Sequence, residues 1–376
     1  MNGVEGANGV PGVSGGDVRL IRILKLLSDR LAITLSTTVM GRKLAELYGL
    51  NCNFHIIKTS TASGIRANIA RILASVLDTP PGRFDLAYSG GEHLYDVLPA
   101  LRMKLFKRTP WLALVHWVED YPWNDKRGGT PALHRYLYWI NRVVAMGLIK
   151  MFADQILAVS ESTREKLVNK RGFARDRVSA VFCGLDLPFA LSVRNSGEPK
   201  IYDATFMKRL NLGKGVRDLI EIWALVVAQR PRSRLQIIGD GPPDVVAELG
   251  LRIRKLGLSD CIELVGVVHD PIDKARRLAQ SKLFVLPSHE ENWAIVIGEA
   301  LAAGLPVIAY DLAEIRHLWQ ERVDWIPFAD TKAFASRILQ RLEAPATAPL
   351  DDFLRSLDWT EIGRNEYEQM QCLIRS

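Results

Sequence analysis

The sequence predicts an α/β protein made of two doubly wound domains, each built on a parallel sheet. Short apolar runs typical of strands alternate with longer segments in which apolar residues recur every three or four positions, and this alternation begins again in the second half. The strand candidates are continuously apolar, as strands covered by helices on both faces require. A length of 376 residues also favours about two domains.

The first half contains predicted helices at 65–77 and 133–151, where apolar residues follow a helical spacing. Its predicted strands are 32–37, 54–57, 84–88, 111–115, 155–159 and 178–182. In the second half, the helix after the first strand has an apolar face that includes Leu219 and Trp223. The predicted strands of this half are 204–206, 235–238, 262–265, 283–286 and 307–309.

The boundary between the two domains is predicted near residues 188–200. Prolines, glycine, serine and asparagine interrupt the strand and helix pattern there. We therefore expect an N-terminal domain over 1–190 and a second domain that begins at 191.

The composition is that of a globular protein and excludes several classes. Hydrophobic residues make up 48% and charged residues 24%, which excludes disorder, collagen and a bare coiled coil. No stretch of about 18 uncharged apolar residues occurs, so a transmembrane helix is not expected. The glycine-rich start lacks the apolar core of a secretory signal. The four cysteines lie far apart and form no metal-binding pattern. We expect a cytoplasmic protein.

The net charge of +7 is unevenly distributed. Residues 1–190 carry a balance of +9 and residues 191–376 a balance of −2. This asymmetry suggests that the halves meet different partners, and anionic phospholipid, a phosphorylated substrate or nucleic acid could each explain it. No zinc finger, aromatic RNA-binding box or dense basic run is present, so a nucleic-acid partner is not expected.

The most informative segment is 286–307, where a strand leads through a polar loop into a helix at 294–303. Such a loop presents backbone N–H groups at a helix N-terminus, which favours an anion such as a diphosphate. Glu291 lies in the loop and Glu299 eight residues later in the helix. A carboxylate there can accept hydrogen bonds from sugar hydroxyls. An isolated pair at this spacing is more often a hydrated loop glutamate and a helix glutamate paired with lysine.

Two cations follow the first strand of the second half. Arg209 and Lys214 lie in segment 206–215 and would reach the same sheet edge, where they suit a diphosphate. Taken alone, they could equally be solvated loop residues. A Gly-Asp-Gly turn at 239–241 then follows the next strand.

Together these segments resemble the C-terminal domain of retaining GT-B-fold glycosyltransferases of the GT4 type, also called glycosyl transferases group 1. The specific element is the Glu-x7-Glu block followed by Ala-x-Ala-x-Gly-x-Pro-Val, and segments 157–163 and 183–186 extend the resemblance into the first half. It implies two Rossmann-like domains that face each other across a cleft. It also implies a donor domain over 191–352 and a C-terminal helix over 353–376 that returns to the first domain.

The resemblance assigns roles to individual residues of the second half. Glu299 would bind the nucleotide ribose, and Glu291 the donor sugar. Arg209 and Lys214 would offset the charge of the departing diphosphate, so neither a metal nor another cofactor is required; the sequence contains no Asp-x-Asp motif. The backbone that would meet the donor sugar belongs to Asn292, Trp293, Ala294 and Ile295.

In the first half, the resemblance points to two further places. Gly15 and Gly16 would form the glycine-rich loop facing the donor phosphates and acceptor, and His116 would lie beside the reacting sugar. An isolated histidine at a strand end is more often structural. Glu92 and His93 close another strand at the same edge and are candidates for contact with the acceptor.

The sequence departs from the family pattern at four places. No apolar strand precedes Gly15, where the family has a central one. Lys208 stands where the family has glycine, and Asn292 and Ala294 replace glycines after Glu291. These three changes alter backbone freedom close to the donor sugar.

We therefore expect a metal-independent glycosyltransferase that moves a sugar from a nucleotide-diphosphate donor, UDP- or GDP-linked, to a hydroxyl of a glycan or lipid-linked acceptor, with retention of configuration. A non-catalytic or regulatory GT-B subunit is the alternative. An NAD-type oxidoreductase is disfavoured because no Gly-x-Gly-x-x-Gly motif follows a first strand. Segments 103–111 and 135–142 mix basic and aromatic residues. They could rest on an anionic membrane at its cytoplasmic face, or form a solvated helix face with core aromatics.

Overall fold

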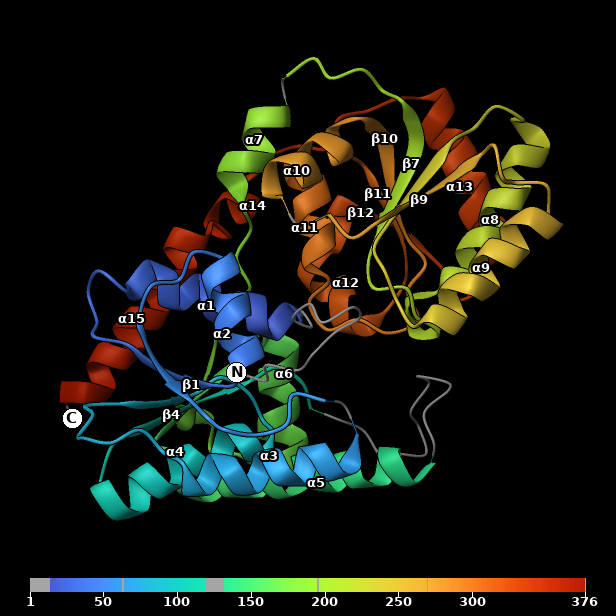
Figure 1. The fold of residues 1–376 in the computed structure, drawn as a ribbon. Helices are drawn as coiled ribbons and strands as arrows, with labels where there is room; N and C mark the ends of the chain where they lie inside the picture. Colours follow the sequence, from blue (N-terminus) through green and yellow to red (C-terminus); the bar gives the residue numbers. More distant parts are fainter. Residues whose placement is uncertain (1–13, 63, 119–131, 195, 269, 376) are drawn as a thin grey trace. The chain divides into compact units, whose positions relative to one another are not determined.

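The computed structural model describes residues 14–62, 64–118, 132–194, 196–268 and 270–375. These residues form two compact units (Figure 1). Unit 1 contains the described residues of 14–118 and 132–184 and the final segment from Trp359. Unit 2 runs from Leu185 to Asp358. The chain therefore leaves unit 1 six residues before the predicted boundary at 190, and the predicted terminal segment 353–376 is divided between the units.

Unit 1 has a parallel four-stranded sheet and a separate parallel pair of strands. The sheet order is β3-β4-β5-β6, and β4 is buried at every position. Its strands are β1 (Thr34–Thr37), β2 (Asn53–Ile56), β3 (Ala87–Ser89), β4 (Trp111–Val115), β5 (Gln155–Ala158) and β6 (Val178–Ala180).

The longer helices of unit 1 lie on both sides of these strands (Figure 1). Helices α3, α4 and α5 lie side by side along one face, and α1 packs against α15 on the other. The helices are α1 (Gly15–Leu27), α2 (Val39–Leu47), α3 (Ile65–Leu77), α4 (Leu94–Lys107), α5 (Ala132–Phe152), α6 (Glu161–Glu165), the π-helical turn η3 (Lys166–Lys170), the 3-10 turn η4 (Arg175–Arg177) and α15 (Trp359–Arg375).

A buried polar cluster joins α1 to α15. The Arg19 guanidinium donates to Glu366 Oε2 at 2.6 Å, and Tyr88 Oη donates to Glu366 Oε1 at 2.6 Å. Arg19 and Glu366 are 1% and 0% exposed, so each charge needs the other to remain inside the fold. Burial and the Glu366 carboxylate raise the pKa of Tyr88 well above its ordinary value, which keeps the phenol a hydrogen-bond donor. This cluster fixes the last helix within unit 1.

Unit 2 is a doubly wound domain with a six-stranded sheet of order β12-β11-β10-β7-β8-β9. Every pairing is parallel. Its strands are β7 (Tyr202–Met207), β8 (Leu235–Ile238), β9 (Ile262–Gly266), β10 (Ser281–Leu286), β11 (Val307–Tyr310) and β12 (Val323–Ile326). The strand order reverses between β7 and β10, and ligands of such sheets bind beyond the carboxyl ends of the strands at this point.

The helical elements of unit 2 connect these strands (Figure 1). They are α7 (Leu187–Arg194), η5 (Leu212–Lys214), α8 (Val216–Gln229), α9 (Pro243–Lys255), α10 (Pro271–Ala279), α11 (Ile295–Ala302), α12 (Ala313–Trp319), η6 (Gln320–Arg322), α13 (Thr331–Glu343) and α14 (Asp352–Ser356). None of the described helices of either unit is long and apolar enough to cross a membrane.

The predicted α/β fold with parallel sheets is confirmed, and each predicted strand is present within a few residues. Strand β12 was not predicted, and the predicted strand at 84–88 begins later, at Ala87. The segment before Ser14, where the sequence shows no strand, lies outside the described residues.

Candidate functional site

Loops after β7, β8 and β10 meet at the switch point of unit 2, and glycines allow their close approach. A Cβ on Gly215 would lie 1.6 Å from the carbonyl oxygen of Pro287, and its φ of 66° already disfavours other residues. A Cβ on Gly239 would lie 1.9 Å from the carbonyl oxygen of Lys208. These contacts bring the loop that contains Lys214 against the loop that contains Glu291.

Glu291 is the centre of this loop cluster. Its carboxylate accepts from Lys208 Nζ at 2.9 Å and from Ser288 Oγ at 2.9 Å, and Lys214 Nζ lies 3.4 Å from Oε1. The side chain is 4% exposed. Burial by itself would raise the pKa of Glu291, but the two ammonium groups outweigh it, so the pKa lies below the ordinary value. Glu291 is therefore an anion held in a fixed position.

The residues after Glu291 lead directly into α11. Ala294 is the N-cap of this helix and has a left-handed backbone, with φ 52° and ψ 57°. This left-handed conformation is usual for glycine, the residue that the sequence resemblance implies at this position. Ile295 is the first residue of the helix, and the N–H groups that precede that of Ile297, which donates to the Ala294 carbonyl, have no acceptor within the helix. Such groups favour an anion.

Trp293 serves the core through its side chain. It is 4% exposed and packs edge-on against Trp319, whose Nε1 donates to the Trp293 carbonyl at 2.9 Å. This contact fixes the loop against the core of unit 2. Asn292, between Glu291 and Trp293, is half-buried. The structure therefore supports a backbone role for this segment.

Glu299 lies one turn into α11 and is paired with a lysine. Lys274 Nζ, from α10, donates to Glu299 Oε1 at 2.6 Å, and the Glu299 side chain is 14% exposed. In this structure Glu299 is therefore a helix glutamate paired with a lysine, which is the structural role that the sequence analysis gave as the more common one for an isolated pair. The pairing leaves Glu299 Oε2 as the oxygen with capacity for a further donor.

The two basic residues predicted after β7 differ in their contacts and in their exposure to solvent. Lys214 donates to the Glu290 carbonyl at 2.6 Å and is close to Glu291, whereas Arg209 lies in the same loop with an exposed side chain. Among the described residues, no group of three or more His, Cys, Asp or Glu side chains is arranged to hold a metal ion.

Unit 1 holds His116 at the carboxyl end of β4. Its Nε2 lies 3.0 Å from the Gly90 carbonyl oxygen, and its backbone N–H donates to Glu92 Oε2 at 2.9 Å. A Cβ on Gly16 would lie 3.1 Å from this Nε2, whereas Gly15 has open space around it. Gly16 therefore admits the imidazole beside the start of α1.

Glu92 is a buried residue of unit 1 that contacts both Arg142 and the backbone of His116. It is 3% exposed and is ion-paired with Arg142, which also donates to the Trp117 carbonyl at 2.8 Å. Burial would raise the pKa of Glu92, but Arg142, His116 and His93 outweigh it and lower the pKa. A carboxylate engaged in this way orients the turn that carries His116. The His93 ring stacks on that of Tyr95, with 5.0 Å between the ring centroids.

The contacts made by two residues of unit 2, Lys208 and Asp218, were not predicted from the sequence. Lys208 was noted only as a replaced glycine, yet it provides the shortest ionic contact of Glu291. Asp218 accepts from Tyr310 Oη at 3.0 Å and lies 2.9 Å from His289 Nε2, which fixes the loop after β10 from the opposite side. Its pKa is lowered, because His289 and Tyr310 together outweigh the effect of burial. No local pattern signals either contact, since the partners are far apart in sequence.

Residues 202–344 match the family model described as Glycosyl transferases group 1. The predicted resemblance is confirmed. The match covers strands β7 to β12, and therefore the group 1 domain contains the Glu291 loop, Lys208, Lys214 and Glu299.

Curated proteins that this chain resembles have several named activities. The chain is 31% identical over 160 residues to an exopolysaccharide phosphotransferase of Streptomyces coelicolor, which covers 42% of this chain and 16% of that protein. It is 28% identical over 195 residues to a D-inositol 3-phosphate glycosyltransferase of Xylanimonas cellulosilytica, covering 46% of this chain and 45% of the relative. The chain thus spans less than half the length of these relatives.

Solved structures extend the similarity of fold to both units. HepE of Anabaena, in complex with UDP and glucose, has a TM-score of 0.74 at 19% identity and covers 95% of this chain and 96% of its own. A sucrose-phosphate synthase of Thermosynechococcus elongatus has a TM-score of 0.74 at 17% identity, with coverage of 96% and 94%. The chain therefore has the GT-B architecture of two Rossmann-like domains.

Proposed function

We propose that this protein is a glycosyltransferase that moves a sugar from a nucleotide-diphosphate donor to an acceptor hydroxyl. The observation that carries the proposal is the Glu291 cluster, in which Lys208, Lys214 and the start of α11 meet at the switch point of a group 1 domain. This combination of fixed cations, free N–H groups and a held carboxylate suits a sugar joined to a diphosphate.

The donor is held by residues of unit 2. Glu299 accepts the ribose hydroxyls, and Glu291 with the backbone of 292–295 binds the sugar. Glu291 already accepts hydrogen bonds from Lys208 and Ser288 and lies 3.4 Å from Lys214 Nζ, so its carboxylate needs little rearrangement before a sugar hydroxyl arrives. The complex of the similar HepE with UDP and glucose supports a UDP-linked donor, and GDP is the other candidate.

The chemical step breaks the bond between the anomeric carbon and the diphosphate oxygen. Negative charge grows on the departing diphosphate, and fixed cations stabilise it more than they stabilise the bound donor. Lys214 and the exposed Arg209 supply these cations, and no metal is needed. Transfer proceeds with retention of configuration: the acceptor oxygen forms its bond to the anomeric carbon on the face from which the diphosphate leaves, and the hydroxyl proton passes to the departing diphosphate oxygen. The acceptor is a glycan or a lipid-linked sugar.

Unit 1 contributes His116, Gly15 and Gly16 to the reaction. The contact of His116 Nε2 with the Gly90 carbonyl and the tether of its backbone to Glu92 hold the ring in one orientation. In this role His116 stabilises the reacting sugar, and the loop at Gly15 meets the donor phosphates or acceptor.

Calorimetric titration with UDP, GDP and ADP in EDTA tests the donor site. We expect the wild-type chain to bind one of these nucleotides, and Glu299→Ala to weaken binding about tenfold or more, because hydrogen bonds to a charged carboxylate are lost. Glu248→Ala is the matched control, since this exposed glutamate of the same unit lies on α9 and pairs with Arg217 of α8 at the surface. Binding that both variants retain would reject the assignment of Glu299.

The alternative is a non-catalytic GT-B subunit, which the sequence before Gly15 motivates. A chain that binds a nucleotide but transfers no sugar to any acceptor of a glycan and lipid panel would favour it. A chain that unfolds cooperatively and binds no nucleotide would reject the donor site itself.

We further propose that unit 1 contacts an anionic membrane through the outer face of α3, α4 and α5. On α3, Ile69, Leu73 and Leu77 recur every fourth position and are 53%, 58% and 75% exposed. A parallel row on α5 is formed by Leu133, Leu137, Ile140, Val144 and Met151, all exposed. The two apolar rows lie on helices that both pack against α4, and together they form a face that a lipid surface can cover.

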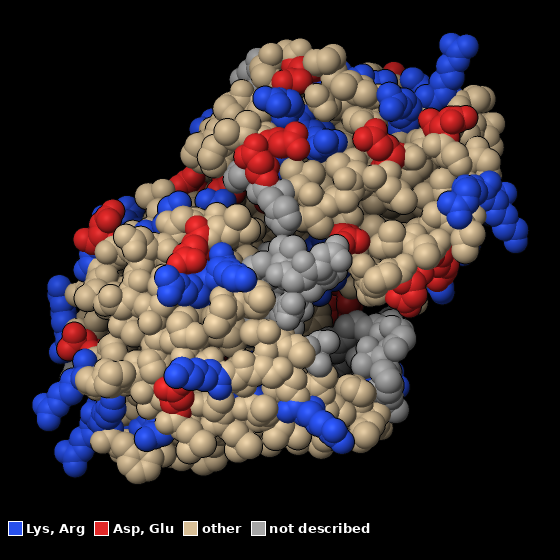
Figure 2. Space-filling view, viewed as in Figure 1, with Lys and Arg blue, Asp and Glu red and all other residues tan. Residues whose placement is uncertain are grey.

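The charge of these three helices favours lipid over a second copy of the chain. They carry eight lysines and arginines, of which Arg71 and Arg142 are buried, and a single acidic residue, Asp96. Basic side chains also outnumber acidic ones over the lower part of the visible surface (Figure 2). Like charges would oppose pairing of two such faces, whereas anionic headgroups attract them.

Sedimentation with vesicles tests this surface. We expect binding to mixed phosphatidylglycerol–phosphatidylcholine vesicles, weaker binding to pure phosphatidylcholine, and loss of binding in Leu73→Asp/Leu137→Asp. Leu47→Asp is the control, because Leu47 is at least as exposed as Leu73 and Leu137 but lies on α2. Equal sedimentation of all three proteins would contradict a role for this face.

A further inference from the structure

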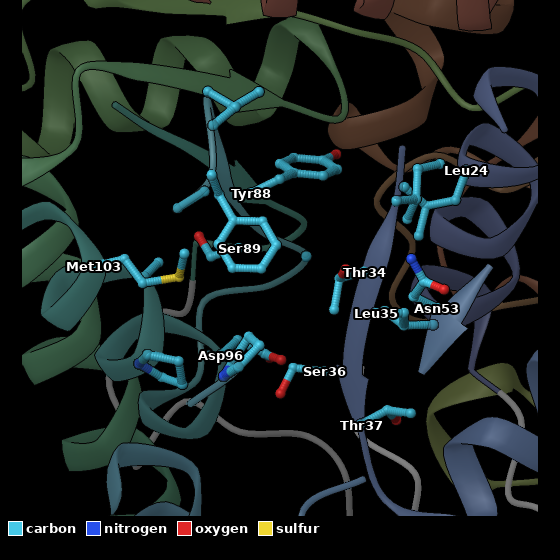
Figure 3. Close-up of a pocket in the computed structure, with 18 of the residues that line it drawn as sticks. Leu24, Thr34, Leu35, Ser36, Thr37, Asn53, Tyr88, Ser89, Asp96 and Met103 are labelled. Atoms are coloured by element: carbon cyan, nitrogen blue, oxygen red, sulfur yellow. The ribbon is translucent and has the colours of Figure 1, made fainter. Parts of the chain in front are cut away.

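Unit 1 contains two hollows whose linings differ in charge. The larger, of about 440 Å³, lies between β1 and β3, where Figure 3 shows Thr34 and Ser36 on one side and Tyr88 and Ser89 on the other. Two arginines and two aspartates line it, so their formal charges cancel. The smaller hollow, of about 170 Å³, runs along α5 and is called the α5 groove below. Its described lining contains three basic residues and no acidic one.

Most of the lining of the α5 groove is apolar. It comprises Trp117 and Val118 after β4, Val143 and Met146 of α5, and Phe173 beyond η3. A concave surface of this composition favours a hydrocarbon chain, because contact with it removes apolar area from water.

Gly147 connects the α5 groove with the outer face of α5. It lines the groove, and on the helix it lies in one row with the exposed residues Ile140, Val144 and Met151. Glycine weakens a helix interior, yet no heavy atom outside its own part of the helix lies within 4 Å of the position that its Cβ would take. Packing within the described chain therefore does not require glycine here. The missing side chain leaves a gap in the apolar row through which the groove opens.

Basic groups flank the α5 groove at both ends. Lys150 Nζ donates to the Arg171 carbonyl at 2.8 Å and lies 5.9 Å from the centroid of the Phe173 ring. At the other end, Lys166 Nζ lies 5.9 Å from the centroid of the Trp117 ring. The π-helical turn η3 begins at Lys166 and has Arg171 as its C-cap. This turn, of a rare type that is common at functional sites, thus places two basic residues beside the groove.

We propose that the α5 groove binds one molecule of an anionic phospholipid, with an acyl chain on the apolar lining and the phosphate between Lys150 and Arg171. The inference rests on the proposed contact of unit 1 with an anionic membrane. Arg142, the third basic residue of the lining, is already paired with the buried Glu92. Lys150 and Arg171 therefore supply the positive charge that a phosphate meets.

The size of the α5 groove agrees with a lipid that stays partly in the membrane. A volume of about 170 Å³ holds part of one chain, and the remainder can lie over the exposed apolar row of α5. Trp117 follows His116 directly, so a lipid in the groove would hold the turn after β4 at a fixed depth relative to the membrane surface.

Calorimetric titration with dihexanoyl phosphatidylglycerol, kept monomeric below its critical micelle concentration, tests the groove without a membrane. We expect one molecule to bind per chain, and dihexanoyl phosphatidylcholine, whose headgroup has no net charge, to bind about fivefold more weakly. Glycerol 3-phosphate has the phosphate but no acyl chain and should bind about tenfold more weakly or less. Equal binding of glycerol 3-phosphate would assign the site to free phosphate and overturn the proposal.

Gly147→Leu places a side chain over the groove and should weaken binding of the phosphatidylglycerol about tenfold. Val144→Leu is the matched control, since it enlarges a residue of the same exposed row that does not line the groove. Gly147→Leu should unfold at or above the wild-type midpoint, because replacing glycine at an open helical position favours the helix. Equal binding by the two variants would overturn the proposal.

Lys150→Gln tests the position of the phosphate. It should weaken binding of the phosphatidylglycerol about fivefold and leave that of the phosphatidylcholine within about twofold. Lys170→Gln is the control, because this exposed lysine of η3 does not line the groove. Equal losses in both variants would show that only general positive charge attracts the lipid and would contradict a site at Lys150.

Vesicle sedimentation separates this inference from the proposed membrane face. Sedimentation of the wild-type chain without binding of monomeric lipid would support the face and overturn the groove. Binding of monomeric lipid without sedimentation would support the groove and reject the face. A dimer that Gly147→Leu abolishes and lipid does not affect would assign the groove to a second copy of the chain and would also overturn the proposal.

Discussion

Lys208 and Glu291 form an ion pair in which Nζ lies 2.9 Å from Oε2, on a carboxylate whose side chain is 4% exposed. The two residues are 83 positions apart and come from the loops after β7 and β10. Lys208 departs from the glycine that the sequence resemblance implies at this position, and it places an ammonium group against the Glu291 carboxylate. The predictions that follow begin from this pair.

Glu291→Gln should lower the free energy of unfolding by about 2 kcal/mol at neutral pH. The loss is smaller than for a fully buried pair because Lys208 and Lys214 keep access to water. The pKa of Glu291 is depressed in the fold, so its contribution is complete above the ordinary value of 4.5 and falls as the pH drops through the lowered value. Urea unfolding at neutral pH and at about pH 3 should therefore show a shrinking difference between the proteins. Glu248→Gln, an exposed control, should show no measurable change at either pH.

Lys208→Gly should change the choice of donor sugar more than the affinity for the nucleotide. The substitution restores the family residue and leaves Glu291 with Lys214 as its nearby cation. We expect the Kd of the nucleotide to change less than about threefold, and the ratio of turnover between two nucleotide sugars to change about tenfold. Calorimetry and a panel of donors measure the two quantities. An unchanged ratio would show that Lys208 does not contact the sugar region.

Ala294→Gly should stabilise unit 2 by about 1 kcal/mol, because the left-handed backbone of Ala294 is unfavourable for a residue with a Cβ. Ala300→Gly is the control of opposite sign. Ala300 lies inside α11 with helical neighbours on both sides, and glycine there should cost about 1 kcal/mol. Thermal unfolding of both variants measures the difference. Equal destabilisation would mean that Ala294 is not strained.

Gly215→Ala should destabilise unit 2 by more than about 4 kcal/mol, since the new methyl group would overlap the Pro287 carbonyl. Gly257→Ala is a close match, because its φ of 68° resembles that of Gly215 but no atom lies within 4 Å of its Cβ position. It should cost only about 1 kcal/mol. Similar losses in both variants would indicate that backbone conformation, not loop contact, makes glycine necessary at 215.

Much of the fold followed from local patterns. Continuous apolar runs predicted strands such as β4 and β8 with their observed bounds, and helical spacing predicted α3. Strand β12 escaped because its sequence alternates, with Asp324 between buried Val323 and half-buried Trp325 at the edge of the sheet. An edge strand lacks the second covered face that produces a continuous apolar run.

The site was less accessible to sequence reasoning than the fold. The motif around Glu291 predicted the loop and its helix, but the roles of its side chains depend on distant partners. Trp293 belongs to the core because Trp319 packs on it, and Lys208 pairs with Glu291 through the meeting of two loops. Such contacts between separate elements leave no spacing signal. The roles assigned to Glu299, His116 and the glycines at 15 and 16 remain proposals for experiment.

The Arg19–Glu366 pair has a consequence for the order in which the chain matures on the ribosome. These two residues are separated by 347 positions, so Arg19 emerges on the order of half a minute before its carboxylate at ordinary translation speeds. During that time α1 cannot bury its guanidinium with a partner charge. The described part of unit 2, from Leu185 to Asp358, is complete before Glu366 is made. The second unit can therefore fold while the first still waits for its final helix.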